Sequence, residues 1–358
     1  MENVKVTVWL STYNQAPYVA QALDSILMQK TTFPFEVIAA DDCSTDGTQE
    51  IILQYQKQYP DKIIPYFTNP NVGGCRKLCD CIDKGLFRGE YISFLEGDDY
   101  WLGEDRLQTL AVFLENHPEY SRVSHRRKIV DEAGNEKGFD IPENLLNKPF
   151  TIQDFLDGKS YSDFGSVFRN YFKEAGAKYH PLLLSSRNVC DFQDMFITQD
   201  FGPVYVIDRV FGVYRSRSNP GATNYNSITS QAARCKDHIR IARAVEAFYH
   251  GKYDLSPMIL HQQKRLVSDA VQQQSKELLD AAREYVPAEA MQKIAPELLY
   301  LARRGHRKEE INFIKDNLLP QEKAGLAVHT AAYSMKRAWW KLRKYHPNEK
   351  FRGYVRSK

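Results

Sequence analysis

The sequence predicts an α/β fold, in which a mixed sheet flanked by helices is followed by a helical C-terminal region. Over the first hundred residues, short apolar β-branched runs alternate with amphipathic helical patterns, which is typical of a parallel sheet with helices on both faces. From about residue 228 the strand patterns stop and long helical periodicity takes over. A length of 358 residues suits two domains, or one large domain with an appendage.

The first elements are predicted by their periodicity. Residues 4–10 alternate in polarity and are rich in β-branched side chains, which indicates a strand. Between residues 18 and 28 apolar side chains recur at i, i+3, i+4, i+7 and i+8, the pattern of an amphipathic helix. Residues 35–40 form a second apolar run that is short enough for a buried strand, and it ends in Asp41 and Asp42.

The same alternation continues along the chain. The next expected elements are a helix at 49–59, a strand at 63–67, a helix at 76–85 and a strand at 91–95. A hairpin turn is expected at 131–135, and strands at 165–170 and 210–214. In the last third the helical patterns lie at 242–249, 262–285, 296–304 and 309–317, and Pro296 is well placed to open its helix.

Polar clusters follow each of the first four predicted strands. They lie at residues 11–14, 41–42, 69–74 and 96–99. Because the carboxyl ends of parallel strands meet at one edge of the sheet, where open α/β sheets bind ligands, the sequence predicts a binding site at this edge.

Two common phosphate-binding motifs are missing from the sequence. It has neither a GxGxxG after the first strand nor a GxxxxGK[ST], so a dinucleotide oxidoreductase or a P-loop NTPase is not supported. A diphosphate would then need another counter-charge, and a divalent cation held by carboxylates supplies one. Glu96, Asp98 and Asp99 are placed for this at the end of a buried strand, although a solvated acidic loop is the alternative.

Cysteine content and targeting signals indicate an intracellular environment. The beginning of the sequence lacks a secretory signal pattern, and no apolar run approaches the ~18–20 residues of a membrane-spanning helix. The six cysteines are expected as reduced thiols, and the spacing of Cys75, Cys79 and Cys81 differs from that of paired zinc hooks. We therefore expect a cytoplasmic protein, at most held on a membrane surface.

The net charge of +3 is unevenly distributed. Residues 336–358 carry nine Lys or Arg and one Glu, a net +8, which leaves −5 on the other 335 residues. This tail mixes its basic side chains with Trp339, Trp340 and Tyr345, a composition that suits the headgroup region of an anionic membrane surface. A tail packed on its own domain is the alternative, and the acidic body argues against nucleic acid as a partner.

Four segments in register resemble the successive signatures of family 2 glycosyltransferases of the GT-A fold, above all bacterial members that build surface polysaccharides and lipopolysaccharide. The similarity runs from residue 4 to about 130 and resumes weakly from 150 to 217. The segments are residues 7–14 (TVWLSTYN), 40–48 (ADDCSTDGT), 71–74 (NVGG) and 94–101 (FLEGDDYW). The resemblance implies a Rossmann-like mixed sheet and a nucleoside diphosphate sugar as donor.

The resemblance also implies roles for individual residues at the donor's nucleoside. Thr12 and Tyr13 would line the nucleoside pocket, and Asp42 would accept hydrogen bonds from the base or ribose. Arg76 would offer its charge to the donor. The alternatives are that Tyr13 is a turn aromatic packed on the first helix and that Arg76 is a helix-surface arginine.

The acidic run would hold the diphosphate. By the same resemblance Glu96 would face the ribose or a bound water, and Gly97 would let the backbone approach the diphosphate closely. Asp98 and Asp99 would be the carboxylates that ligate a divalent cation, Mn²⁺ or Mg²⁺. Relatives often complete the metal shell with a histidine where this chain has Arg217, a fixed cation that cannot ligate. Either fewer protein ligands hold the ion, or Arg217 contacts the diphosphate directly.

Inverting transfer needs a base that removes the proton of the acceptor hydroxyl. In the family an acid at the start of a later helix takes this role, and Asp191 matches in position, with Asp194 one turn further on as the reserve. The alternative is that Asp191 only caps its helix. Residues 216–224 are expected to form a loop that closes over donor and acceptor.

We therefore expect a metal-dependent inverting glycosyltransferase that transfers a sugar to a saccharide or lipid-linked glycan in cell-surface polysaccharide biosynthesis. The expected domains are a GT-A domain at 1–225, with a donor half at 1–130 and an acceptor half at 131–225, a helical appendage at 226–330, and a basic aromatic tail helix at 331–358. The alternatives are a sugar nucleotidyltransferase, which would need a glycine-rich loop with Arg and Lys after the first strand, and a catalytically degenerate binding protein.

Overall fold

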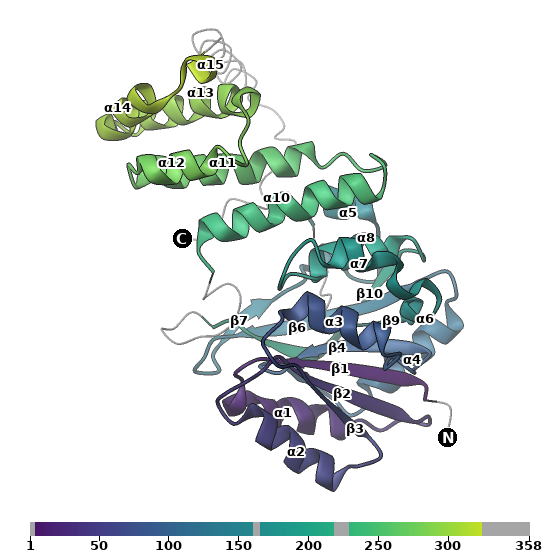
Figure 1. Cartoon of the computed structure of the whole chain (residues 1–358). Coiled ribbons are helices and arrows are strands. Elements are labelled where there is room, and N and C mark those ends of the chain that lie inside the picture. Colours follow the sequence, from purple (N-terminus) through teal and green to yellow (C-terminus); the bar gives the residue numbers. More distant parts are fainter. Residues whose placement is uncertain (1–3, 160–164, 218–228, 324–358) are drawn as a thin grey trace. The chain divides into compact units, whose positions relative to one another are not determined.

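The structure, a computed structural model, describes residues 4–159, 165–217 and 229–323 (Figure 1). Its contacts divide the chain into two compact units, one containing the described residues up to 217 and the other those from 229 onward. The expected closing loop from residue 218 onward and the basic aromatic tail lie outside the described residues. Among the described helices, none is both long and apolar enough to cross a membrane.

The first unit is built on a ten-stranded mixed sheet. Eight of its strands follow the order β3-β2-β1-β4-β9-β6-β10-β5, and off this path β7 pairs with β6 and β8 pairs with β10. β1 pairs in parallel with both β2 and β4, and β2 pairs in parallel with β3. These four strands are β1 (Val6–Thr12), β2 (Phe35–Asp41), β3 (Ile63–Phe67) and β4 (Tyr91–Glu96). The predicted α/β fold is therefore confirmed, and all four early strands lie where the sequence pattern placed them.

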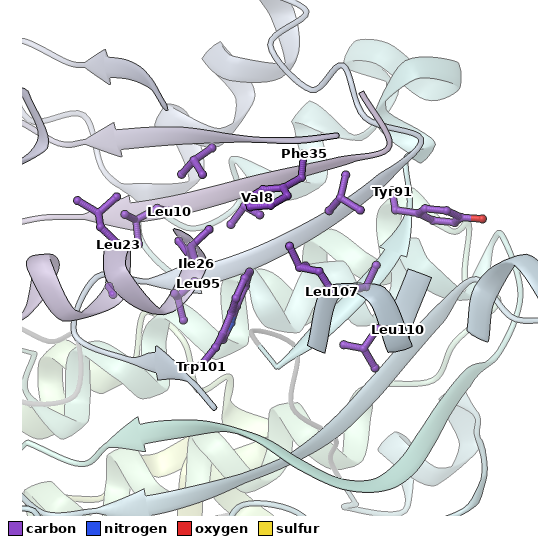
Figure 2. Close-up of a cluster of buried hydrophobic side chains, with 14 of the residues drawn as sticks. Val8, Leu10, Leu23, Ile26, Phe35, Tyr91, Leu95, Trp101, Leu107 and Leu110 are labelled. Atoms are coloured by element: carbon purple, nitrogen blue, oxygen red, sulfur yellow. The ribbon is translucent and has the colours of Figure 1, made fainter. Parts of the chain in front are cut away.

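Helices cover both faces of this sheet, as Figure 1 shows. They are α1 (Ala16–Leu27), α2 (Thr48–Gln58), α3 (Gly74–Asp83) and α4 (Arg106–Asn116). The alternation of β1 decides which helix each side chain meets. Val8 and Leu10 point into a core shared with α1, α2 and α4 (Figure 2), whereas Trp9 points to the other face, where Lys77 of α3 lies over its ring.

The later strands extend the sheet beyond β4. The set is β5 (Tyr100–Trp101), β6 (Arg122–Val130), β7 (Glu136–Phe139), β8 (Lys148–Phe150), β9 (Ser166–Arg169) and β10 (Val204–Arg215). β9 runs antiparallel to both β4 and β6, and β10 runs parallel to β6 and antiparallel to β5. The predicted hairpin turn at residues 131–135 joins β6 to β7, with the Gly134 amide donating to the Asp131 carbonyl at 2.9 Å.

Four short helical segments lie between β8 and β10 together with one longer helix. The short segments are α5 (Ile152–Leu156), α6 (Tyr171–Ala175), η2 (Gly176–Tyr179) and α7 (His180–Leu183), in addition to η1 (Glu143–Leu145) before β8. The longer helix is α8 (Asp191–Gln199). α3 contacts α7, and α7 contacts α8, so this group covers the same face of the sheet as α3.

The second unit is entirely helical in its described part. It contains α10 (Gln231–Phe248), α11 (Ser256–Gln272), α12 (Lys276–Ala282), α13 (Ala288–Arg304), α14 (Lys308–Asn317) and α15 (Pro320–Lys323). The first five of these helices share one apolar core. The expected single helix at 262–285 is wrong, because Gln274 adopts a positive φ of 51° and Ser275 then caps a new helix. The prediction that Pro296 opens a helix is also wrong, because α13 begins after Pro287 and contains Pro296 in its interior. Packing of the buried side chains around Pro296 compensates for the backbone hydrogen bond that a proline removes.

Candidate active site

The carboxyl ends of β1, β2 and β4 lie side by side and bring three of the predicted polar clusters together. Thr12 ends β1, Asp41 ends β2 and Glu96 ends β4. The clusters are bonded to one another, since the Thr12 hydroxyl donates to Asp41 at 2.8 Å and the Gly97 amide donates to the Ser11 carbonyl at 2.9 Å. We call residues 11–14, 41–42, 69–74 and 96–99 the carboxyl edge.

Asp41 and Asp42 are both buried, but they differ in whether their carboxylates have an unused hydrogen-bond acceptor site. Asp41 accepts four hydrogen bonds, from the Thr12 hydroxyl, the Gln49 side-chain amide, and both the backbone amide and the hydroxyl of Ser44. A carboxylate offers about four acceptor sites, so Asp41 is fully used in holding the loop.

Asp42 organises the neighbouring loop and retains one acceptor site. Its Oδ1 accepts from the Thr68 hydroxyl at 2.7 Å and the Val72 amide at 2.8 Å, and its Oδ2 accepts from the Gly73 amide at 2.8 Å. Oδ2 therefore keeps one lone pair that a ligand can use.

Lys77 is a buried residue of this edge that the sequence analysis missed. Its ammonium on α3 donates to the Ala40 carbonyl at 2.8 Å, the Thr12 carbonyl at 3.1 Å and the Ser11 hydroxyl at 3.2 Å. Burial lowers the pKa of Lys77, although the negative charges of Asp42 and Asp41 oppose that fall. Lys77 thus cross-links the ends of β1 and β2 beneath the polar clusters.

Replacing Lys77 with methionine is expected to lower the free energy of unfolding by about 1–3 kcal/mol, because the carbonyls of Ala40 and Thr12 each lose one hydrogen-bond donor. Urea unfolding followed by circular dichroism measures the effect. Lys84→Met, directly after the end of the same helix, is the matched control, since Lys84 is exposed. An unchanged midpoint in the Lys77 variant would show that the ammonium does not hold these strands together.

Arginines contact both of the aspartates expected as metal ligands. Arg217 forms an ion pair with Asp98, with its Nη2 2.8 Å from Oδ2. Asp99 Oδ2 accepts from Arg127 Nη1 at 3.0 Å, and Asp99 Oδ1 accepts from the Arg215 amide at 2.9 Å. Burial raises the pKa of Asp98, an effect that the Arg217 charge opposes, and burial together with the Asp98 charge raises that of Asp99 to about 7.

The pKa of Glu96 lies well above that of an ordinary glutamate. Burial raises its pKa to about 8, and the negative charges of Asp98, Asp99 and Asp191 add to this rise, whereas Lys77 opposes it.

The raised pKa of Glu96 predicts how stability changes with pH. The folded protein keeps the Glu96 proton up to about pH 8, whereas the unfolded chain releases it near its ordinary value of 4.5. Stability therefore falls as pH rises between these values and levels off above them. In Glu96→Gln we expect the urea midpoint to fall less between pH 5 and pH 8.5 than in the wild type and in the exposed-site control Glu50→Gln. Parallel pH profiles for all three proteins would contradict this.

The described residues do not offer a ready set of metal ligands. No group of three or more His, Cys, Asp or Glu side chains in the described part of the chain is arranged to hold an ion. To ligate a cation, Asp98 would have to exchange its Arg217 partner for it, and Asp99 would have to give up Arg127 or the Arg215 amide. The residues present therefore do not fit a divalent cation, and we derive no catalytic step through one.

Asp191 and Asp194 lie in contrasting environments on α8. Asp191 is exposed at the first position of the helix, after the N-cap residue Cys190, so it is not the N-cap itself. Asp194 is buried, forms an ion pair with Arg122 and accepts a hydrogen bond from the Tyr171 hydroxyl. Of these two side chains, only that of Asp191 is exposed.

The loop before α8 is fixed against the start of α3. The Cys75 amide donates to the Arg187 carbonyl at 3.1 Å, and the sulfur atoms of Cys75 and Cys190 lie 2.7 Å apart. Gly73, with a φ of 90°, is required here because a Cβ would lie 2.4 Å from the Arg187 side chain. All six cysteines are free thiols.

The family is decided by a comparison with known sequences. The profile described as glycosyl transferase family 2 matches residues 7–179. Residues 7–179 form a family 2 glycosyltransferase domain. This agrees with the ten-stranded mixed sheet, and the fold is of the GT-A type.

Curated relatives align with the family 2 domain over part of their length. An uncharacterized protein of Mycobacterium tuberculosis is 39% identical over 156 residues, 44% of each chain. The putative teichuronic acid biosynthesis glycosyltransferase TuaG of Bacillus subtilis is 29% identical over 140 residues, 39% of this chain and 54% of TuaG. The chain thus spans about half or less of the length of these relatives.

A solved structure shares the fold over nearly the whole chain. The crystal structure of residues 1–349 of Staphylococcus aureus TarS in complex with UDP-GlcNAc covers 93% of this chain and 92% of that one, with a TM-score of 0.56 and 18% identity. TarS, a poly(ribitol-phosphate) β-N-acetylglucosaminyltransferase, is also 34% identical by sequence over 148 residues, 40% of this chain and 24% of TarS. At 18% identity the structural likeness shows the fold alone.

The other residues that the sequence predicts to bind the donor lie in different surroundings. Tyr13 is 37% exposed at the carboxyl edge, and Thr12 is buried with its hydroxyl turned towards Asp41. Gly97 packs against Thr12 and Gln15, where a Cβ would lie within 2.6 Å of both, so its lack of a side chain has a packing cause. Arg76 is exposed and pairs with Asp80 one turn along α3. These positions leave the assigned roles as predictions.

Proposed function

We propose that this chain is an inverting glycosyltransferase that moves a sugar from a nucleoside diphosphate sugar to a saccharide acceptor. The observation that carries the proposal is an exposed acid, Asp191, on the first turn of α8. The residue before it, Cys190, has its sulfur 2.7 Å from that of Cys75 at the start of α3, which ties the start of α8 to the carboxyl edge. A donor seated on the edge would present its sugar between the strand ends and that acid.

The nucleoside would bind at the ends of β1 and β2. Asp42 is the better acceptor for a base or ribose, because Oδ2 keeps a lone pair whereas every acceptor site of Asp41 is used. Tyr13, exposed at the same edge, offers a ring for stacking, and Thr12 supports it by fixing the end of β1 to Asp41. Glu96, Gly97 and Asp98 would lie along the ribose and diphosphate.

Asp191 would act as the general base. An inverting transfer forms a bond from the acceptor oxygen to the anomeric carbon while the bond to the diphosphate breaks, and the acceptor proton must leave in the same step. Asp191 is the exposed acid on this side, and Asp194 is committed to Arg122 and Tyr171. The start of α8 also favours a carboxylate, because helix N-termini stabilise negative charge.

The proposed class of acceptor is supported by the names of relatives and not by the geometry of the candidate site. TuaG and TarS carry names that place them in teichuronic acid synthesis and in glycosylation of poly(ribitol phosphate), both cell-surface polymers. We extend this to a cell-surface glycan or lipid-linked saccharide acceptor for this chain, at the cytoplasmic face of a membrane that residues 336–358 would bind. A divalent cation at Asp98 and Asp99 remains the family's alternative for neutralising the diphosphate.

A donor screen tests the proposal. UDP-, GDP-, CDP- and dTDP-linked sugars are incubated with the protein with and without Mn²⁺, and nucleotide release is measured together with binding of the free nucleoside diphosphates. We expect at least one nucleotide sugar to bind and to be turned over. If none binds in either buffer, the proposed function is wrong.

A further inference from the structure

Two cysteines from distant parts of the chain meet beside the carboxyl edge. Cys75 lies in the first turn of α3, and Cys190 is the residue directly before α8. Their sulfur atoms are 2.7 Å apart, although the two residues are separated by 115 positions in the sequence. A disulfide bond is about 2.0 Å long, so a movement of about 0.7 Å would bring the two sulfurs to bonding distance.

Contacts other than the sulfurs hold these two segments together. The Cys75 amide donates to the Arg187 carbonyl at 3.1 Å. The Arg187 guanidinium donates to the Asn71 carbonyl at 3.0 Å and to the Asn71 side-chain oxygen at 2.6 Å. The stem of Arg187 packs so closely on Gly73 that a Cβ there would lie 2.4 Å from it. The neighbours of both cysteines therefore fix the distance between Cys75 and Cys190.

We propose that Cys75 and Cys190 are a modification site, at which a low-molecular-weight disulfide oxidises the two thiols to a reversible disulfide bond. The bond would tie the loop at residues 69–74, which Asp42 organises, to the helix that carries Asp191. Disulfides in a reducing compartment are usually transient, so this bond is a modification of the free-thiol protein and not a permanent part of its fold. The inference goes beyond the proposed function and does not depend on it.

The reaction is a thiol–disulfide exchange in two steps. The Cys190 thiolate attacks one sulfur of the small disulfide, forms a mixed disulfide and releases one small thiol. The Cys75 thiolate then attacks Cys190 Sγ and displaces the second small thiol. The two protein thiols thus lose two electrons and two protons, which the small disulfide gains. Cys190 reacts first because it is 8% exposed, whereas Cys75 is fully buried.

Burial protects both thiols while the loop before α8 is closed. The contact with Cys75 and burial raise the pKa of Cys190 well above its usual range, so little of this thiol is ionised. The loop carries exposed side chains at Arg187 and Asn188, and local opening of such a segment lets a small reagent reach Cys190. We therefore expect the bond to form slowly and to be reversed by an excess of small thiol.

Peptide mapping of the full wild-type chain tests the bond directly. The protein is equilibrated with hydroxyethyl disulfide and 2-mercaptoethanol at several ratios, free thiols are alkylated in denaturant, and tryptic peptides are analysed by mass spectrometry. Trypsin separates Cys75 (residues 63–76) from the other two cysteines of α3 (residues 78–84) and from Cys190 (residues 188–209). We expect the Cys75 and Cys190 peptides to be linked under oxidising conditions and separate after reduction. Alkylation of both thiols at every ratio, or a link from Cys190 to the peptide 78–84, would overturn the inference.

Alanine variants provide a second measurement through stability. Cys75→Ala and Cys190→Ala each remove one partner, and Cys79→Ala is the matched control, since it removes another buried thiol one turn further along α3. Oxidation should raise the urea midpoint of the wild type and of Cys79→Ala, because the bond constrains the unfolded chain, and should leave the other two variants unchanged. An equal rise in all four proteins would contradict the inference. Peptide mapping of the wild type decides the question if a variant does not fold.

Discussion

Replacing Asp191 with asparagine is expected to lower the rate of sugar transfer about 100–10,000-fold, the contribution of a general base. Asparagine keeps the shape of the side chain but cannot take the proton of the acceptor hydroxyl. Binding of the nucleoside diphosphate should change little, because Asp191 lies on α8 and not on the strands of the carboxyl edge. The effect should therefore appear in kcat with little change in the KM for the donor.

Stability and surface controls separate this effect from misfolding. An acid in the first turn of a helix contributes about 0.3–1 kcal/mol through the helix dipole, so Asp191→Asn should unfold close to the wild-type midpoint. Asp208→Asn removes an exposed carboxylate from β10 and should transfer sugar at the normal rate. If Asp191→Asn also transfers at the normal rate, another group acts as the base.

The neighbouring substitution Asp194→Asn is expected to destabilise the fold by about 3–5 kcal/mol. It leaves Arg122 buried without its counter-charge beside β9, and it weakens the hydrogen bond from the Tyr171 hydroxyl. Denaturant unfolding measures this effect. Because single-domain stabilities are of the order of 5–15 kcal/mol, the variant should unfold at a much lower midpoint.

A double variant distinguishes loss of the ion pair from loss of packing. Replacing both members, Arg122→Met/Asp194→Leu, removes the buried charges together, and such exchanges are often neutral or stabilising. We expect the double variant to be more stable than Asp194→Asn. If Asp194→Asn is as stable as the wild type but inactive, Asp194 belongs to the catalytic machinery and the assignment of the base must change.

The first half of the fold could be predicted because its signals are local. Each early strand is a short apolar run followed by polar residues, and the helices between them show clear periodicity. Parallel strands then place their carboxyl ends together, so the carboxyl edge followed from four segments of sequence. The sheet order confirms this for β1 to β4.

The second half depends on long-range pairing that no local pattern records. β9 lies between β4 and β6, and the buried partnership of Arg122 with Asp194 joins residues 72 apart in sequence. The arginines that neutralise the acidic run come from β6 and from the end of β10, more than 25 residues away from it. Residue types alone therefore predicted a cation site where the fold places guanidinium groups.

Lys77 was missed because lysine is almost never buried without a partner. A signal did exist, since Lys77 lies one residue from Leu78 and four from Cys81, both on the buried side of α3. A lysine within an apolar helical face indicates a buried ammonium that needs hydrogen-bond acceptors. In this protein the acceptors are the carbonyls of Ala40 and Thr12 at the strand ends.

The location of the donor site is the central claim, and hydrogen–deuterium exchange with the tightest-binding of UDP, GDP, CDP and dTDP tests it most directly. We predict that the nucleotide slows exchange in the peptides covering residues 11–14, 41–42, 69–74 and 96–99. Peptides of the helical unit at residues 229–323 should exchange at the same rate with and without it. Protection confined to the helical unit, with none at the carboxyl edge, would contradict the account.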